Sequence, residues 1–195
     1  MKKLILATHN EHKAVEFRQI LPQFLVQTLA DLNYDQEIAE TASDLEGNSF
    51  LKADKIYKQY GHIVVSDDSG LEVLALGGEP GVFSARYAGE EKNDQRNIEK
   101  LLLKMEGVNN RMAQLRTVIT WMSSEKTLQF EGTVTGVIAH EPRGIKGFGY
   151  DPVFIPDGHH QTFAELTSNE KNKISHRANA TQKLLNFLEK HPTFC

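Results

Sequence analysis

The chain has 195 residues, 39% of them hydrophobic and 25% charged, an ordinary composition for one globular domain or two closely joined lobes. The formal net charge of −4 does not favour duplex nucleic acid as a partner, and no apolar stretch approaches the roughly 20 residues of a membrane span. The amino-terminal apolar run gives way to the polar Thr8-His9-Asn10 too soon for a signal peptide, so we expect a cytoplasmic protein. The one cysteine, Cys195, excludes an internal disulfide framework and a cysteine-based zinc site.

The first third of the chain alternates strand and helix patterns. Lys3 to Ala7 predicts a buried strand, and Asn10 is a suitable cap for a helix that ends at Pro22. The elements expected next are a strand at 25–29, a helix from about Asn48 that stops at Gly61, and a strand at 63–66. This order predicts a sheet with crossover helices.

The remaining two thirds change to longer alternating patterns. Ala113 to Trp121 and Leu128 to Ile138 alternate with period two, which predicts two long antiparallel strands. Around them we expect a helix closed by Gly107, a strand at 152–155, a helix opened by the capping box Thr167/Glu170, and a final helix at 178–188. We therefore predict an α/β fold: one domain, residues 1–195, with an elongated mixed β-sheet, flanking helices and two lobes around a central cleft.

Two adjacent acids follow the apolar run Ile63 to Val65, in the sequence Ser66-Asp67-Asp68-Ser69-Gly70. The carboxyl end of a buried strand is where α/β sheets keep their chemistry, and carboxylates there suit Mg²⁺ or the positioning of a water molecule. The alternative is a strand followed by an Asx turn.

A phosphate site is indicated between the first strand and the first helix. Thr8, Asn10 and Lys13 lie in that turn, where backbone N–H groups, the positive helix end and a lysine can hold a phosphate. The alternative is that Asn10 is a plain helix cap and Lys13 is solvated.

Other polar residues gather near the carboxyl end. Lys171, His176 and Arg177 fall around the start of the last helix and can read an anion or a base edge. Phe148 can offer a flat face to a base and Asp151 an acceptor, whereas Tyr150 is better placed in the core. Glu40, taken alone, is typical of a surface acid.

Five motifs, in order, resemble those of the inosine triphosphate pyrophosphatase family. They are Thr8-His9-Asn10-Glu11-His12-Lys13, Ser66-Asp67-Asp68-Ser69-Gly70-Leu71, Gly78-Glu79-Pro80-Gly81-Val82-Phe83-Ser84-Ala85-Arg86-Tyr87, Phe148-Gly149-Tyr150-Asp151-Pro152 and Ile174-Ser175-His176-Arg177. The resemblance implies hydrolysis of the deaminated purine nucleotides ITP, dITP and XTP to the monophosphate and pyrophosphate, by a homodimer of the predicted fold.

The resemblance also implies roles for individual residues. The triphosphate loop of the family matches Thr8, Asn10 and Lys13. Asp68 matches the catalytic carboxylate of the family, and Glu40 together with Asp68 matches its Mg²⁺ site. Ser69 matches a further substrate contact. The residues that match the base and sugar pocket are Phe148, Gly149, Tyr150, Asp151, Lys171, His176 and Arg177.

One position departs from the family pattern. Where the family commonly has Glu before the Asn that opens the second helix, this chain has Gly47 before Asn48, with Glu46 one place earlier. If that acid supports the metal indirectly, then Glu46 takes over or the metal site is weaker here. Neither His9 nor His12 is assigned a role.

Three alternatives are weighed against this interpretation. A nucleotide sensor would lack the paired acids, a related septum-associated pyrophosphatase would prefer pyrimidine or modified nucleotides, and an interaction module would explain none of the motifs. Asp68 either deprotonates the attacking water or holds the metal that does so. Arg177 is the candidate donor to O6 of hypoxanthine or xanthine.

Overall fold

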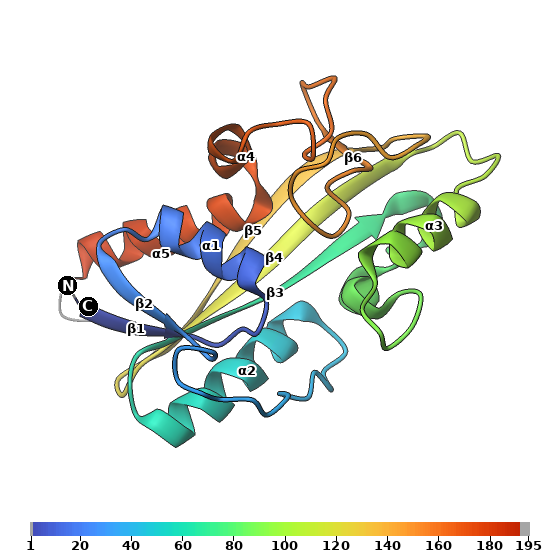
Figure 1. Cartoon of the computed structure of the whole chain (residues 1–195). Coiled ribbons are helices and arrows are strands. Elements are labelled where there is room, and N and C mark those ends of the chain that lie inside the picture. The colour runs from blue at the N-terminus through green and yellow to red at the C-terminus, as the bar shows by residue number, and fades with distance from the viewer. Residues whose placement is uncertain (1, 192–195) are drawn as a thin grey trace. The chain divides into compact units, whose positions relative to one another are not determined.

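The computed structural model describes residues 2–191, and Cys195 lies outside the described residues. Within that range a six-stranded sheet has the strand order β2-β1-β3-β4-β5-β6 (Figure 1). Its strands are β1 (Lys2–Leu6), β2 (Phe24–Thr28), β3 (Val64–Val73), β4 (Met112–Met122), β5 (Thr127–Ile138) and β6 (Phe154–Pro156). Because β1 pairs in parallel with β2 and β3 whereas β5 pairs antiparallel with β6, the sheet is mixed, which confirms the predicted fold class.

The chain divides into two compact units. The first, called the N-terminal unit here, contains the residues up to Asp68, Thr117–Gly132 and the chain from Arg177 onward. The second, called the middle unit, contains Ser69–Arg116 and Thr133–His176. The cleft and the single-domain organisation stay predictions.

In the N-terminal unit, β1 has helices on both of its faces (Figure 1). Leu4 and Leu6 pack with side chains of α1 (Glu11–Ile20) and α5 (His176–Lys190). Ile5 and Ala7 pack with side chains of α2 (Leu45–Tyr60). Successive residues of a strand point to opposite faces, and helices cover both faces of β1. The sequence of β1 is therefore a continuous apolar run.

The helix ends follow the local sequence. Asn10 caps α1, and Gly61 ends α2 in the left-handed conformation, as predicted. Helix α2 begins three residues earlier than Asn48, because the Asp44 side chain accepts a hydrogen bond from the Gly47 backbone N–H at 2.7 Å and caps the helix there.

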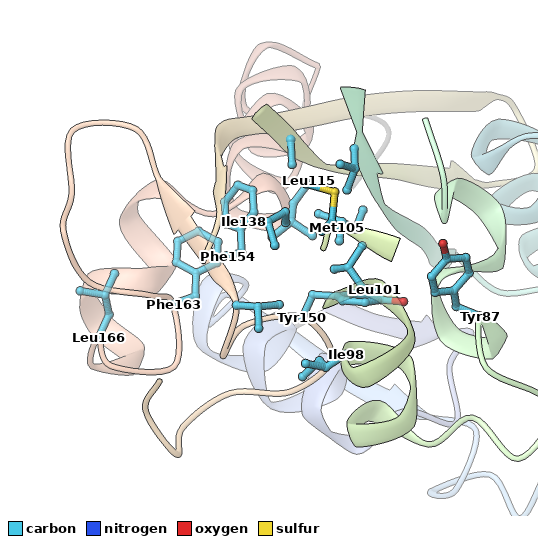
Figure 2. Close-up of a cluster of buried hydrophobic side chains, with 14 residues drawn as sticks. Tyr87, Ile98, Leu101, Met105, Leu115, Ile138, Tyr150, Phe154, Phe163 and Leu166 are labelled. Atoms are coloured by element: carbon cyan, nitrogen blue, oxygen red, sulfur yellow. The ribbon is translucent and has the colours of Figure 1, made fainter. Parts of the chain in front are cut away.

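The middle unit has its own apolar core, which Figure 2 shows. Ile98 and Leu101 of α3 (Asp94–Lys104) lie against Tyr150 in this cluster. Tyr150 is buried, and its hydroxyl donates to the Ser84 carbonyl at 2.9 Å, which confirms that it is a core residue. The short helices of this unit are η1 (Leu74–Leu76), η2 (Gly81–Arg86) and α4 (Ser168–Ile174), the last opened by the predicted capping box.

Two strand predictions were wrong in their limits. Strand β3 continues to Val73, so Asp67 and Asp68 lie inside it, and neither a strand end nor an Asx turn occurs at the acids. The strand can continue because buried cations, described below, compensate both carboxylates. Strand β6 begins at Phe154 rather than Pro152, because the Val153 and Phe154 N–H groups both turn back to the Tyr150 carbonyl.

Across residues 2–191, none of the helices combines the length and the apolar character needed to span a bilayer.

Candidate active site

The two acids of β3 point to opposite faces of the strand, as consecutive strand residues must. Asp67 meets cations carried by α1 and α5, and Asp68 meets a cation carried by α2. The helices that cover the two faces of β3 therefore supply the cations that compensate its two carboxylates.

Asp67 lies in a buried cluster with two cations. Its Oδ2 is 3.0 Å from Lys13 Nζ and 3.0 Å from Arg177 Nη2, and the Arg177 side chain is only 1% exposed. Burial by itself would raise the pKa of Asp67, but the charges of Lys13 and Arg177 outweigh it and hold the pKa well below its usual value. Arg177 also donates from Nη1 to Glu16, so its guanidinium joins two acids from different elements.

Asp68 shares a buried lysine with Glu40. Lys52 Nζ lies 2.7 Å from Asp68 Oδ1 and 3.0 Å from Glu40 Oε1. Burial would lower the pKa of Lys52, but Asp68 and Glu40 together raise it, so the side chain stays an ammonium. Burial raises the pKa of Asp68, and the nearby lysines offset this only in part.

The turn after β1 is ordered by its own side chains. The Asn10 N–H donates to Thr8 Oγ1 and the Lys13 N–H donates to Asn10 Oδ1, both at 3.1 Å. Asn10 is thus a helix cap, while the Lys13 side chain is 14% exposed and paired with Asp67 rather than solvated. The loop presents the positive end of α1 beside a lysine that is mostly, but not fully, buried.

Buried hydroxyls join α2 to the strand that carries the acids. Ser66 of β3 donates to the Ser49 carbonyl at 2.6 Å, and the Ser49 and Thr120 hydroxyls lie 2.8 Å apart. Gln129 Nε2 donates to Thr120 Oγ1 at 3.0 Å and to the Glu46 carbonyl at 2.8 Å. Since Ser49 is one helical turn before Lys52, this network fixes the helix that presents the lysine.

The loop that carries Glu40 is tied to the start of α2. The Ala42 N–H donates to Asn48 Oδ1 at 2.9 Å, and Asn48 is fully buried. A Cβ atom on Gly47 would lie 2.5 Å from the Ala42 Cβ, a distance that real Cβ contacts do not reach. The absence of a side chain at Gly47 therefore lets this loop approach the helix closely.

The middle unit holds a second polar group, formed by Phe148, Asp151 and Lys171. Lys171 Nζ is 2.6 Å from Asp151 Oδ2 and lies 4.8 Å from the centroid of the Phe148 ring. Asp151 Oδ2 also accepts from the Phe148 N–H at 2.9 Å. A side chain at Gly147 would occupy this space, since its Cβ would fall 2.0 Å from Asp151 Oδ2.

The other predicted site residues have these positions. Ser69 follows the acids in β3 and is half-buried, and Gly149 has a φ of +59° and donates its N–H to Asp94 at 2.7 Å. His176 is buried at the first position of α5. The structure thus brings Lys13, Asp67 and Arg177 together, and Asp151 with Lys171.

Sequence reasoning missed Glu16 and Lys52. Lys52 lies on α2 in a stripe of buried residues with Ser49, Ala53 and Ile56. A lysine in such a stripe is rarely left without a partner and so signals a buried ion pair. Glu16 directly precedes the core residue Phe17, which is a similar but weaker signal.

The carboxylates of Glu40 and Asp68 suit a hard divalent cation such as Mg²⁺. Between residues 2 and 191 no group of three or more His, Cys, Asp or Glu side chains gathers that could hold a metal by itself. Mg²⁺ is usually bound by one or two carboxylates together with substrate phosphates, and Glu40 and Asp68 supply two carboxylate oxygens around one cation position.

Comparison with known proteins identifies the family. The model of the Ham1 family matches residues 4–187, and the chain belongs to this family. It is 50% identical to a dITP/XTP pyrophosphatase of Bacillus licheniformis and 49% identical to one of Bacillus subtilis, in each case over 97% of this chain and at least 98% of the relative. The resemblance inferred from the five motifs is thereby confirmed.

Solved structures agree with this assignment. The Staphylococcus aureus Ham1 protein superposes with a TM-score of 0.88 at 44% identity, over 97% of this chain and 99% of that chain. A HAM1 protein from Coxiella burnetii gives the same TM-score at 38% identity, over 97% of this chain and 100% of that chain.

Proposed function

We propose that this chain is a nucleoside triphosphate pyrophosphatase that hydrolyses ITP, dITP and XTP to the nucleoside monophosphate and pyrophosphate. The observation that carries the proposal is the pair of buried acids in β3, each compensated by a lysine, next to the helix-capping turn after β1. Relatives at 50% and 49% identity bear the name dITP/XTP pyrophosphatase, which supports this substrate class. The reaction would remove miscoding precursors from the nucleotide pool.

The turn after β1 is the proposed triphosphate site. A nucleoside triphosphate brings roughly four negative charges, which must be neutralised before water can attack the α-phosphorus. The N–H groups at the start of α1 and the Lys13 ammonium supply positive charge there, with Thr8 and Asn10 holding the turn in shape. Ser69 would add a hydroxyl contact.

Glu40 and Asp68 are the proposed ligands of Mg²⁺. When bound, the ion would neutralise phosphate charge and lower the pKa of a coordinated water molecule. Asp68 remains a candidate for two roles, since its carboxylate can accept a proton from water or hold the cation. Burial, which raises the pKa of Asp68, is compatible with the first role.

The group around Lys171 is the proposed base and sugar pocket. Phe148 offers a ring face, while Asp151 and Lys171 offer an acceptor and a donor that already orient each other at 2.6 Å. The proposed pocket is completed by Gly149, Tyr150 and His176. Tyr150 would support it from within the core. Arg177 is proposed as the donor to O6, although reaching a base would require it to release contacts with Asp67 and Glu16.

We further propose that the protein acts in the cytoplasm as a homodimer and requires no nucleic acid or membrane partner. Size-exclusion chromatography with light scattering measures the dimer directly. A mass of one 22.0 kDa chain at micromolar concentration would contradict it.

The test of the function is product analysis over a nucleotide panel. ITP, dITP, XTP, GTP, ATP and dUTP are each incubated with Mg²⁺, and early time points are separated by chromatography. We expect ITP, dITP and XTP to be consumed well before GTP, ATP and dUTP, with pyrophosphate and IMP formed in one step from ITP. Accumulation of IDP before IMP would contradict attack at the α-phosphorus, and activity that persists in EDTA would contradict the metal.

A further inference from the structure

We propose that Lys52 occupies the cation position of the substrate-free enzyme, so that a divalent metal ion enters the site only together with the nucleotide. This inference rests on the proposed function, because it concerns the same pair of carboxylates. It adds a role for Lys52, which neither the sequence motifs nor the names of the relatives assign.

The Lys52 ammonium lies where the two carboxylates converge. Lys52 Nζ lies between Glu40 Oε1 and Asp68 Oδ1, at 3.0 and 2.7 Å, so the lysine makes the contacts that a bridging metal ion would make. The Lys52 and Asp68 side chains are each 9% exposed. The Glu40 side chain is more open, at 27% exposed, so it is the Lys52–Asp68 pair that water screens least.

The ammonium and a metal ion cannot share this position. Mg²⁺ binds carboxylate oxygens at about 2.0–2.1 Å, which would place the ion within a few ångströms of an ammonium held by the same oxygens. The repulsion between a divalent and a monovalent cation at that separation is strong in a poorly hydrated site. Entry of the metal ion therefore requires Lys52 to withdraw.

Once withdrawn, the Lys52 ammonium needs another acid as its partner. Its other close acid is Asp67 across the strand, and that carboxylate already lies 3.0 Å from both Lys13 and Arg177 nitrogens. A metal ion that arrives alone thus leaves a buried lysine without compensation. A metal ion that arrives with a triphosphate brings negative charge for both cations.

The test measures metal binding without turnover. Mn²⁺ serves as the spectroscopic substitute for Mg²⁺, and free Mn²⁺ is measured by electron paramagnetic resonance as protein is added in the absence of nucleotide. We expect weak Mn²⁺ binding by the wild-type protein and at least about tenfold tighter binding by Lys52→Met, in which the ammonium no longer competes for the two carboxylates. Adding Asp68→Asn to Lys52→Met should abolish the gain.

Lys58→Met is the matched control. Lys58 lies on the same helix in an exposed ion pair with Asp54, with 73% of its side chain exposed, so its removal subtracts the same charge at a distance from the site. An equal gain in Mn²⁺ affinity from Lys58→Met would overturn the proposal, because the loss of one positive charge anywhere on the helix would then explain the effect. Equal affinity of wild type and Lys52→Met would overturn it as well.

A measurement on the wild-type protein decides the case if Lys52→Met does not fold. Mn²⁺ binding is compared with and without the non-hydrolysable analogue α,β-methylene-ITP, after correction for Mn²⁺ held by the free analogue. Tighter binding of the metal in the presence of the analogue supports the proposal, and equally tight binding without it refutes the role of Lys52. Failure of the proposed function gives a different pattern, in which the analogue does not bind and no nucleotide releases pyrophosphate.

Discussion

Replacing Gly47 by alanine tests the close approach of the Glu40 loop to α2. The added Cβ would lie 2.5 Å from the Ala42 Cβ and 3.0 Å from the Asp44 carboxylate oxygen that caps the helix. The Asn48 side chain holds the Ala42 backbone, so the loop cannot move away without losing that hydrogen bond. Overpacking of this kind costs about 1–3 kcal/mol, whereas glycine to alanine in a helix gains up to about 1 kcal/mol.

We therefore expect Gly47→Ala to lower the free energy of unfolding by about 1 kcal/mol. In a background of Ala42→Gly, which removes the opposing methyl group, the same substitution should instead raise it by up to about 1 kcal/mol. The coupling between the two sites is then about 2 kcal/mol. Urea denaturation followed by circular dichroism resolves this, because 1 kcal/mol shifts the midpoint by roughly 0.5 M.

The double-mutant cycle also gives the result that would refute the reasoning. If Gly47→Ala stabilises the wild-type protein, or costs the same in both backgrounds, then the Ala42 methyl group does not exclude a side chain at Gly47. A positive result would give a physical reason for the glycine at position 47, since Ala42 fills the space that a side chain would need.

Three further predictions address the acids and the elements that hold them. Asp68→Asn should keep the circular dichroism spectrum and lower turnover of ITP at least about 100-fold, as loss of a general base does; near-normal turnover would make the neighbouring acid the central one. Arg177→Met leaves two buried acids without their shared cation, so the free energy of unfolding should fall by about 3–5 kcal/mol in urea. In the fraction that stays folded, ITP activity should fall more than ATP activity, and an unchanged preference would exclude base reading by Arg177. Thr120→Val should cost about 1–3 kcal/mol of unfolding free energy because buried hydroxyls lose a partner, while Thr120→Ser should be nearly neutral; equal stability of the two variants would show that this network does not hold α2.

The sequence predicted most elements because their signals are local. Asn10 and the Thr167/Glu170 box are caps whose partners lie three residues away, and the apolar run of β1 reports burial on both faces. The limits of β3 could not be predicted in this way. Two adjacent acids end a strand unless cations from distant segments compensate them, and those cations are not visible in a local window.

The same reason limits what could be predicted of the candidate site. The motifs identified Lys13, Asp67 and Arg177, but not that they form one cluster, since Arg177 is 110 residues from Asp67. Lys52 belongs to none of the five motifs, and its role follows only from the two oxygens that its ammonium contacts. Pairings of this kind depend on how the helices cover the sheet.

The arrangement of the N-terminal unit has a consequence for synthesis on the ribosome. Glu16 and Asp67 are made early, yet their shared partner Arg177 lies 161 and 110 residues further along the chain. The middle unit is complete once His176 has emerged, whereas the N-terminal unit lacks α5 until translation is nearly finished. A nascent chain therefore carries two acids without their guanidinium partner for most of its synthesis. A product truncated before α5 would expose the apolar face that α5 covers, which makes it a substrate for chaperones and proteases rather than a partly active enzyme.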